Sequence, residues 1–174
     1  MEDQVVNYIQ TFFTEHVFET KISINKKKEN HHWKESWLNK MSYPNSPNHR
    51  TNHTIIHIQD EICSRFEGKV LKEVPLQDSE GNTISGHKFD LLIPSTYAAI
   101  EICLGNIKNE FEKDVFKGML DSRVTRLYIF TREYITGKDE LLFGYRWFDN
   151  PANKSIISLA KDYNLEVIPM TLVI

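Results

Sequence analysis

Two short apolar runs separated by a tight turn constrain the middle of this chain more than any other feature. Residues 89–94 and 97–104 are rich in Leu, Ile and Ala, with a Pro-Ser-Thr turn where they meet. Apolar runs bounded by turn residues predict a β-hairpin. Each run also carries one acid, Asp90 in the first and Glu101 in the second. An ionised carboxylate in an apolar strand is costly unless a counter-charge accompanies it, and a bound metal ion commonly supplies that charge.

The two acids are of the kind that binds magnesium. Mg²⁺ prefers hard oxygen ligands and keeps several waters, so two carboxylates on neighbouring strands suit it. We therefore expect Asp90 and Glu101 to converge on one divalent cation, with water in the remaining positions.

The residues around this hairpin resemble the PD-(D/E)XK nucleases, in which an Asp precedes a strand that closes on Glu-x-(Lys/Glu/Gln). Glu101, the Gly105-Asn106 pair after it and the helix that follows are similar to the type II restriction endonucleases of the BamHI/BglII group. The similarity spans residues 51–174 and is concentrated in 86–132. It implies a restriction-endonuclease-like fold and Mg²⁺-dependent cleavage of DNA. Cutting both strands of a palindrome also implies a homodimer.

The chain departs from that family at Cys103, where the family usually has lysine. A thiol cannot supply the ammonium that orients the attacking water, and it is a poor Mg²⁺ ligand. Beside Asp90 and Glu101, we therefore expect the backbone carbonyl of Ile102 or Cys103, and not the thiol, to bind the metal. Lys108, Lys113 and Lys117 are candidates for a relocated ammonium, and the family pattern favours Lys117. A solvated position on the helix surface is the alternative for each. The apolar spacing predicts a buried stripe on this helix, made of Phe111, Val115, Phe116, Met119 and Leu120.

The resemblance also implies a third acid near the end of the preceding helix. Glu67 fits that place better than Asp60 or Glu61. Its alternative is an exposed charge at a helix end, where a negative side chain opposes the helix dipole. Strand alternation puts His87 on the opposite face from Asp90, in a structural or DNA-proximal position.

Composition indicates a compact globular protein and excludes several classes. The 174 residues, of which 40% are hydrophobic, suit a single domain over residues 1–174. No apolar run approaches the ~20 residues of a membrane span, and no secretory signal is evident. The two cysteines, Cys63 and Cys103, are too few for a disulfide framework, so reduced thiols in a cytoplasmic protein are expected.

Charge is unevenly distributed along the chain. The net charge of −3 does not fit a protein that coats nucleic acid non-specifically. Residues 21–50 nevertheless hold seven lysine and arginine side chains against two acids, interleaved with aromatic and amide side chains. This mixture suits phosphate contact and base reading, and a solvated N-terminal excursion is the alternative. The region 133–150 is a second candidate for DNA contact. The expected contact residues are Lys26, Lys27, Lys28, Lys34, Asn106 and Arg146.

Periodicity and turn residues predict an α/β fold with a mixed central sheet flanked by helices. A helix and a basic loop occupy residues 1–50, and the catalytic core occupies 51–174. The expected helices are 2–18, one from Thr51 or Asn52 to Phe66, 107–121 and 151–163. The expected strands are 70–77, 83–94, 97–104, 126–131 and 165–174, with 24–50 as loop and 141–148 as strand or irregular structure.

These features together predict a metal-dependent endodeoxyribonuclease, most specifically a type II restriction enzyme that cuts double-stranded DNA as a homodimer. Mg²⁺, with Mn²⁺ as a substitute, polarises the scissile phosphate and lowers the pKa of a bound water. A lysine stabilises the developing charge. One alternative is a non-catalytic nucleic-acid-binding or interaction module on a degenerate nuclease fold. The other is a repair or RNA-cleaving nuclease.

Overall fold

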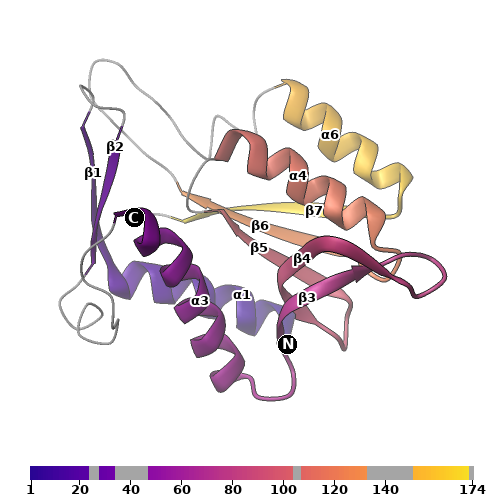
Figure 1. Cartoon of the computed structure of the whole chain (residues 1–174), viewed down its shortest axis with the longest axis horizontal. Helices are drawn as coiled ribbons and strands as arrows, with labels where there is room; N and C mark the ends of the chain where they lie inside the picture. The colour runs from indigo at the N-terminus through magenta and orange to yellow at the C-terminus, as the bar shows by residue number, and fades with distance from the viewer. Residues whose placement is uncertain (24–27, 34–46, 104–106, 133–150, 173–174) are drawn as a thin grey trace.

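A five-stranded sheet with helices on both faces makes up the centre of the molecule (Figure 1). This computed structural model describes the backbone over residues 1–23, 28–33, 47–103, 107–132 and 151–172. Side chains are described over residues 1–12, 55–103, 111–131 and 151–172. The mixed α/β class expected from the sequence is confirmed.

The strands of this sheet lie in chain order. They are β3 (Leu71–Gln77), β4 (Thr83–Ile93), β5 (Ala98–Cys103), β6 (Arg126–Arg132) and β7 (Glu166–Leu172). β3, β4 and β5 form an antiparallel meander, whereas β5, β6 and β7 are parallel. Parallel neighbours need a crossover connection, and α4 (Ile107–Leu120) and α6 (Pro151–Asp162) lie in the two crossovers.

The helices cover the two faces of the sheet in pairs. α1 (Glu2–His16) and α3 (Pro47–Arg65) pack on one face, and α4 and α6 pack on the other (Figure 1). Each face has its own apolar core. The buried helical residues of the first core are Val5, Val6, Ile9, Phe12, Ile58 and Ile62. The second draws them from Phe111, Val115 and Ala160.

Strand β5 lies at the centre of the sheet, and all six of its residues are buried. A strand covered on both faces is expected to be apolar throughout. Its sequence is Ala-Ala-Ile-Glu-Ile-Cys, so Glu101 interrupts this rule. The fold therefore places one carboxylate in the middle of its most buried strand.

Most element boundaries from residue 70 onward agree with the sequence prediction to within one or two residues, and β5 begins at Ala98 and β7 at Glu166. The region 141–148 lies outside the described residues. No helix in the described ranges is long and apolar enough to cross a membrane.

The N-terminal part differs from the prediction. Val17 and Phe18, expected to end the first helix, begin β1 (Val17–Ser23), which pairs with β2 (Lys28–Trp33) inside the expected loop. These strands are rich in charged and polar residues, so no apolar alternation reveals them in the sequence. α3 also begins earlier than Thr51, at Pro47, because proline is well suited to the first turn of a helix.

Candidate active site

The hairpin β4–β5 brings Asp90 and Glu101 to the same level of the sheet. The ladder between the two strands pairs Leu91 with Ile100 and is not continued to the next pair, which would be Asp90 and Glu101. There the backbone N–H of Ile102 donates to Asp90 Oδ2 at 2.8 Å. A side-chain carboxylate thus takes an amide hydrogen that a strand carbonyl would otherwise accept.

The opposite edge of β4 is irregular at the same level. β3 pairs with β4 through Lys72–Leu91 and Val74–Phe89, and the pair between them is absent from the ladder. Glu73, on β3 opposite Asp90, has φ of 52°, a left-handed conformation that is uncommon for a non-glycine residue. The sheet is therefore locally distorted on both sides of Asp90.

Asp90 is held from the α3 side by an amide. Gln59, with an exposed fraction of 1%, donates from Nε2 to Asp90 Oδ1 at 3.1 Å and to Glu73 Oε1 at 3.3 Å. Burial raises the pKa of Asp90 to about 6, although the Ile102 N–H and the charge of Lys117 act in the opposite direction. This carboxyl group therefore changes its charge near pH 6, above the range of an ordinary aspartate.

Glu101 faces the α4 side of the sheet and is 3% exposed. Its carboxylate forms an ion pair with the ammonium of Lys117. Burial raises the pKa of Glu101 well above its usual value, and the negative charges of Asp114 and Asp90 raise it further, while Lys117 lowers it. Because the negative charge of Asp90 raises the pKa of Glu101, the two strand acids interact electrostatically.

Lys117 reaches from α4 into the sheet and is 8% exposed. Its Nζ lies 2.7 Å from Asp114 Oδ1 and donates to the backbone carbonyl of Lys88 at 3.1 Å. Burial lowers the pKa of Lys117, but the charges of Glu101 and Asp114 outweigh burial and raise the pKa above its usual value. The ammonium is thus a permanent cation shared by α4, β4 and β5.

Cys103 is connected to the same cluster. Its Sγ donates to Asp114 Oδ2 at 3.0 Å, and both residues are buried. Asp114 therefore accepts from the thiol with one oxygen and pairs with Lys117 through the other. The Cys103 thiol therefore orients the Asp114 carboxylate, which in turn pairs with Lys117 of α4.

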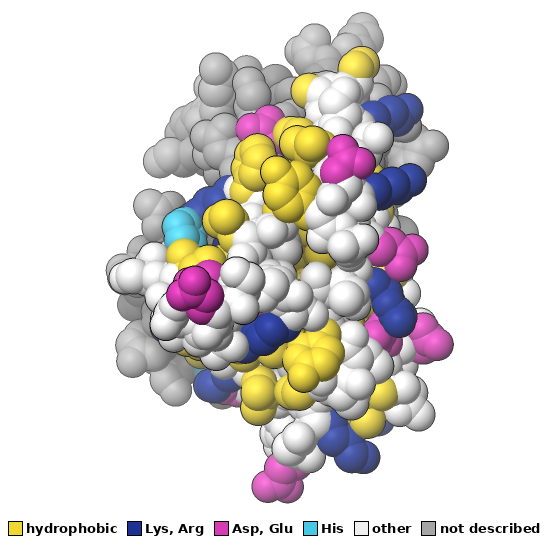
Figure 2. Space-filling model, turned by 90° about the vertical axis from the view of Figure 1, so that its right-hand side faces the viewer, with side chains coloured by type: hydrophobic (Ala, Val, Ile, Leu, Met, Phe, Trp, Pro, Cys, Tyr) yellow, Lys and Arg dark blue, Asp and Glu magenta, His cyan; other side chains and the backbone are white. Residues whose placement is uncertain are grey.

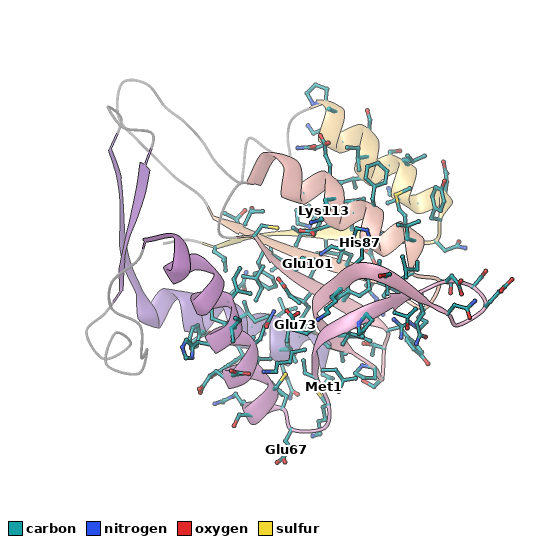
Figure 3. All side chains as sticks on the ribbon, viewed as in Figure 1. Met1, Glu67, Glu73, His87, Glu101 and Lys113 are labelled. Carbon is teal, nitrogen blue, oxygen red and sulfur yellow. The ribbon has the colours of Figure 1, made fainter. Side chains whose placement is uncertain are left out.

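Asp90, Glu101, Asp114 and Lys117 act on one another electrostatically, and we call these four side chains the acid cluster; Asp90 is half-buried and the other three are buried. It holds three carboxylates and one ammonium, so it carries excess negative charge when all of its members are ionised. Figure 3 shows Glu101 between the sheet and α4, in the interior of the molecule.

Glu67, the expected third acid, does not join the acid cluster. It is exposed in the turn after α3, at the lower edge of the molecule in Figure 3, whereas Glu101 lies near the middle. The helix ends at Arg65, so Glu67 projects outward from the turn and does not point back at the sheet. Asp114 supplies the third carboxylate instead.

The predicted stripe on α4 is partly wrong. Phe116 and Leu120 are 46% and 54% exposed, whereas Asp114 and Lys117 are buried. Burying the ion pair with Glu101 turns that side of the helix toward the sheet and leaves two apolar side chains outside. Lys113, the other lysine considered for catalysis, is exposed.

Several expected contact residues lie outside the part of the chain that the structure describes. They are Lys26, Lys27, Lys34, Asn106 and Arg146, and the side chains of Lys28 and Lys108 are likewise undescribed. Sequence reasoning also missed Gln59 and Asp114. The available signal for Asp114 was its place three residues before Lys117, where side chains on a helix meet.

The acid cluster offers carboxylate oxygens, the ligands that hard cations prefer, but few of them are arranged to hold one ion. Within the described ranges, no group of three or more His, Cys, Asp or Glu side chains is arranged to hold a metal ion. A site built from two carboxylates and a backbone carbonyl needs only two such side chains. Carboxylate oxygens with raised pKa values and an excess of negative charge fit Mg²⁺, which would offset the charge that burial disfavours.

Comparisons with protein-family models, with curated proteins and with solved structures gave no match to this chain.

Proposed function

We propose that the protein is a metal-dependent nuclease that hydrolyses DNA phosphodiester bonds. One observation carries this proposal: Glu101 and Asp114 pair with a single buried ammonium, Lys117, and the charges of Lys117 and Asp114 also act on Asp90 at a break in the sheet. Buried acids without matching cations are costly, so a cluster of this kind favours a bound cation as part of its working state.

Asp90 and Glu101 are the proposed metal-binding side chains, joined by the backbone carbonyl of Cys103. Mg²⁺, with Mn²⁺ as a substitute, would polarise a phosphate oxygen and lower the pKa of a bound water. Gln59 and the Ile102 N–H keep the Asp90 carboxylate in one orientation. A preoriented ligand is what a precise metal site requires.

Lys117 is the proposed relocated ammonium. It stays protonated, and it lies against Glu101 through a buried ion pair. A fixed cation in a site from which water is largely excluded stabilises developing negative charge more strongly than it would in bulk water. Asp114 keeps the lysine in place but also competes for its charge. Lys113 is a weaker candidate because it is exposed.

The more specific proposal is a type II restriction enzyme acting on double-stranded DNA as a homodimer. Its support is the resemblance of the Asp90–Asn106 region to the PD-(D/E)XK nucleases, and a mixed sheet with helices on both faces is compatible with a restriction-endonuclease-like fold. The symmetry argument for a dimer applies only if both strands of a palindrome are cut.

The test is incubation of the purified protein with plasmid DNA in Mg²⁺ or Mn²⁺. Discrete fragments support a restriction enzyme, and smearing supports a less specific nuclease. We expect Asp90→Asn and Glu101→Gln to abolish cleavage while Glu67→Gln, an exposed acid outside the cluster, retains it. Cleavage by the first two variants at the wild-type rate would contradict the proposal.

A second candidate is a non-catalytic nucleic-acid-binding module. Cys103 favours it, since the strand position that supplies the ammonium in related enzymes holds a thiol. The buried ion pair of Lys117 with Glu101 disfavours it. Retained DNA binding with no cleavage in either metal would select this second function.

A further inference from the structure

A surface pocket opens beside the acid cluster, between α4 and β4. Its volume is about 350 Å³, and it is lined by His87, Glu112, Lys113, Phe116, Lys117 and Leu120. This is at the lower end of the ~300–1,000 Å³ typical of small-ligand pockets. His87 and Lys113 lie close together at its rim (Figure 3).

The pocket shares one residue with the acid cluster. Lys117 lines it and pairs with Glu101, so an occupant of the pocket lies one side chain away from the proposed metal ligands. Glu101 is buried between the sheet and its covering helices, and Asp90 is half-buried. A substrate phosphate that reaches them from the α4 side therefore places its neighbouring nucleotide at this pocket.

The lining suits a nucleotide. Phe116 and Leu120 are the large exposed hydrophobic residues in the described part of α4, residues 111–120, and both line the pocket. On this side of the molecule hydrophobic side chains gather in patches with basic side chains near them (Figure 2). Lys113 adds an ammonium group to the lining, and His87 adds ring nitrogens that can form hydrogen bonds. Within the described residues, the Nδ1 atom of His87 is buried and has no hydrogen-bond partner. An aromatic face next to cations is the arrangement that holds a base and its phosphate.

We propose that this pocket binds an unpaired DNA nucleotide next to the scissile phosphate, with its base against Phe116 and its phosphate at Lys113. The inference rests on the proposed nuclease function and narrows its substrate. The face of a base is accessible to a side chain only where the base is unstacked, so the bound nucleotide is single-stranded or turned out of the duplex. Glu112 can accept a hydrogen bond from a base amino group.

The first test compares binding of a fluorescein-labelled single-stranded oligodeoxynucleotide with binding of its duplex, in EDTA so that cleavage does not interfere. Stacking on an aromatic side chain contributes ~1–3 kcal/mol per base, so Phe116→Ala is expected to weaken single-strand binding about tenfold. Phe116→Tyr keeps the ring and should restore it. Leu159→Ala, at an exposed leucine of α6 outside the pocket, is the matched control and should change nothing.

The second test uses the phosphate contact. Lys113→Met is expected to weaken binding and to reduce the dependence of binding on salt concentration. The variant makes one phosphate contact fewer, so its binding releases fewer counterions from the DNA. A probe carrying 2-aminopurine should become brighter on binding the wild type, because the base leaves its stacked neighbours for the pocket, and the change should be smaller with Phe116→Ala.

Unchanged single-strand binding by Phe116→Ala would overturn the pocket proposal, whereas an equal loss for duplex and single strand would support a base that is turned out of the duplex. If wild-type protein still cleaves plasmid when that single-strand binding is unchanged, the nuclease proposal stands without the pocket. Protein that neither binds the oligonucleotides nor cleaves plasmid would contradict both.

Discussion

At the scale of single residues, Lys117 decides the charge balance of the acid cluster. It pairs with Glu101 and Asp114 and donates to the Lys88 carbonyl. Removing one partner of a buried ion pair typically costs ~3–5 kcal/mol because the remaining charge is buried alone. Lys117→Met is therefore expected to lower the free energy of unfolding by about that amount at pH 8, measured by urea denaturation.

The loss should be smaller at pH 5, because protonation of Asp90 and Glu101 relieves the uncompensated charge. Lys113→Met changes an exposed lysine four positions earlier on the same helix and is the control, with little expected effect on stability. A Lys117→Met protein as stable as wild type at pH 8 would show that the ammonium does not balance these acids.

Cys103 allows a second prediction at this scale. Its thiol donates to the Asp114 carboxylate, and hydrogen bonds to charged groups contribute ~1.5–3 kcal/mol. Cys103→Ala should lower the free energy of unfolding by about 2 kcal/mol, whereas Cys103→Ser keeps a donor and should lose less. Denaturation of both variants checks this. Equal losses for Ala and Ser would mean that the thiol only fills space.

The acids in the strands were predictable from sequence, and their partners were not. Asp90 and Glu101 stand out because each interrupts an apolar run. Asp114 and Gln59 lie among other polar residues on helices, where sequence does not reveal which charge is buried. Only the packing of α4 on the sheet turns Asp114 and Lys117 inward and leaves Phe116 outside.

At the scale of elements, Gly118 sets how closely α4 approaches the sheet. A Cβ at this position would lie 2.7 Å from Leu165 Cδ2 and 3.1 Å from Leu127 Cδ2. Overpacking typically costs ~1–3 kcal/mol, and the gain in helix propensity from glycine to alanine offsets only ~1 kcal/mol. Gly118→Ala should therefore lower the free energy of unfolding by about 1 kcal/mol and push α4, with its neighbour Lys117, away from Glu101.

A double-mutant cycle with Leu165→Ala isolates the cause. Removing the leucine methyl groups makes room for the added carbon, so the double variant should lose less stability than the sum of the two single variants. Strict additivity would show that the close approach of Gly118 to Leu165 does not limit this packing.

The elements themselves followed from sequence where apolar runs had a clear period, as in β4, β5 and α4. The β1–β2 hairpin did not, because its residues are mostly polar and its strands pair with each other instead of joining the central sheet. The break in the ladder at Asp90 was also not predictable, since it arises from side-chain hydrogen bonds of Gln59 and Asp90.

At the scale of the whole molecule, the acid cluster should link stability to pH and to metal. The pKa of Asp90 is about 6 in the folded protein against an ordinary 3.8, so the folded state binds this proton more tightly than the unfolded chain. The stability that this group contributes is therefore full below about pH 4 and is lost as pH rises to about 6. Glu101 acts in the same direction, since its pKa is also raised.

Among the described groups whose pKa is clearly shifted, the other acids and Lys117 do not reverse this trend between pH 5 and 8. The lowered pKa values of Asp78 and Asp121 affect stability only below their ordinary value of 3.8. The raised pKa of Lys117 affects it only above 10.5. In this window the apo protein should accordingly become less stable as pH rises through about 6, and Asp90→Asn should flatten that dependence.

Under the proposed function, metal should reverse this loss of stability, because a cation bound by the ionised carboxylates would neutralise the charge that destabilises the apo protein. A ligand at ~100 times its dissociation constant stabilises the folded state by ~2.7 kcal/mol. Thermal unfolding with and without Mn²⁺ should thus show a larger upward shift in Tm at pH 8 than at pH 5. Glu67→Gln should keep this shift and Asp90→Asn should lose it. A shift that is equal at both pH values, or that survives Asp90→Asn, would place metal binding outside the acid cluster and remove the physical basis for hydrolysis there.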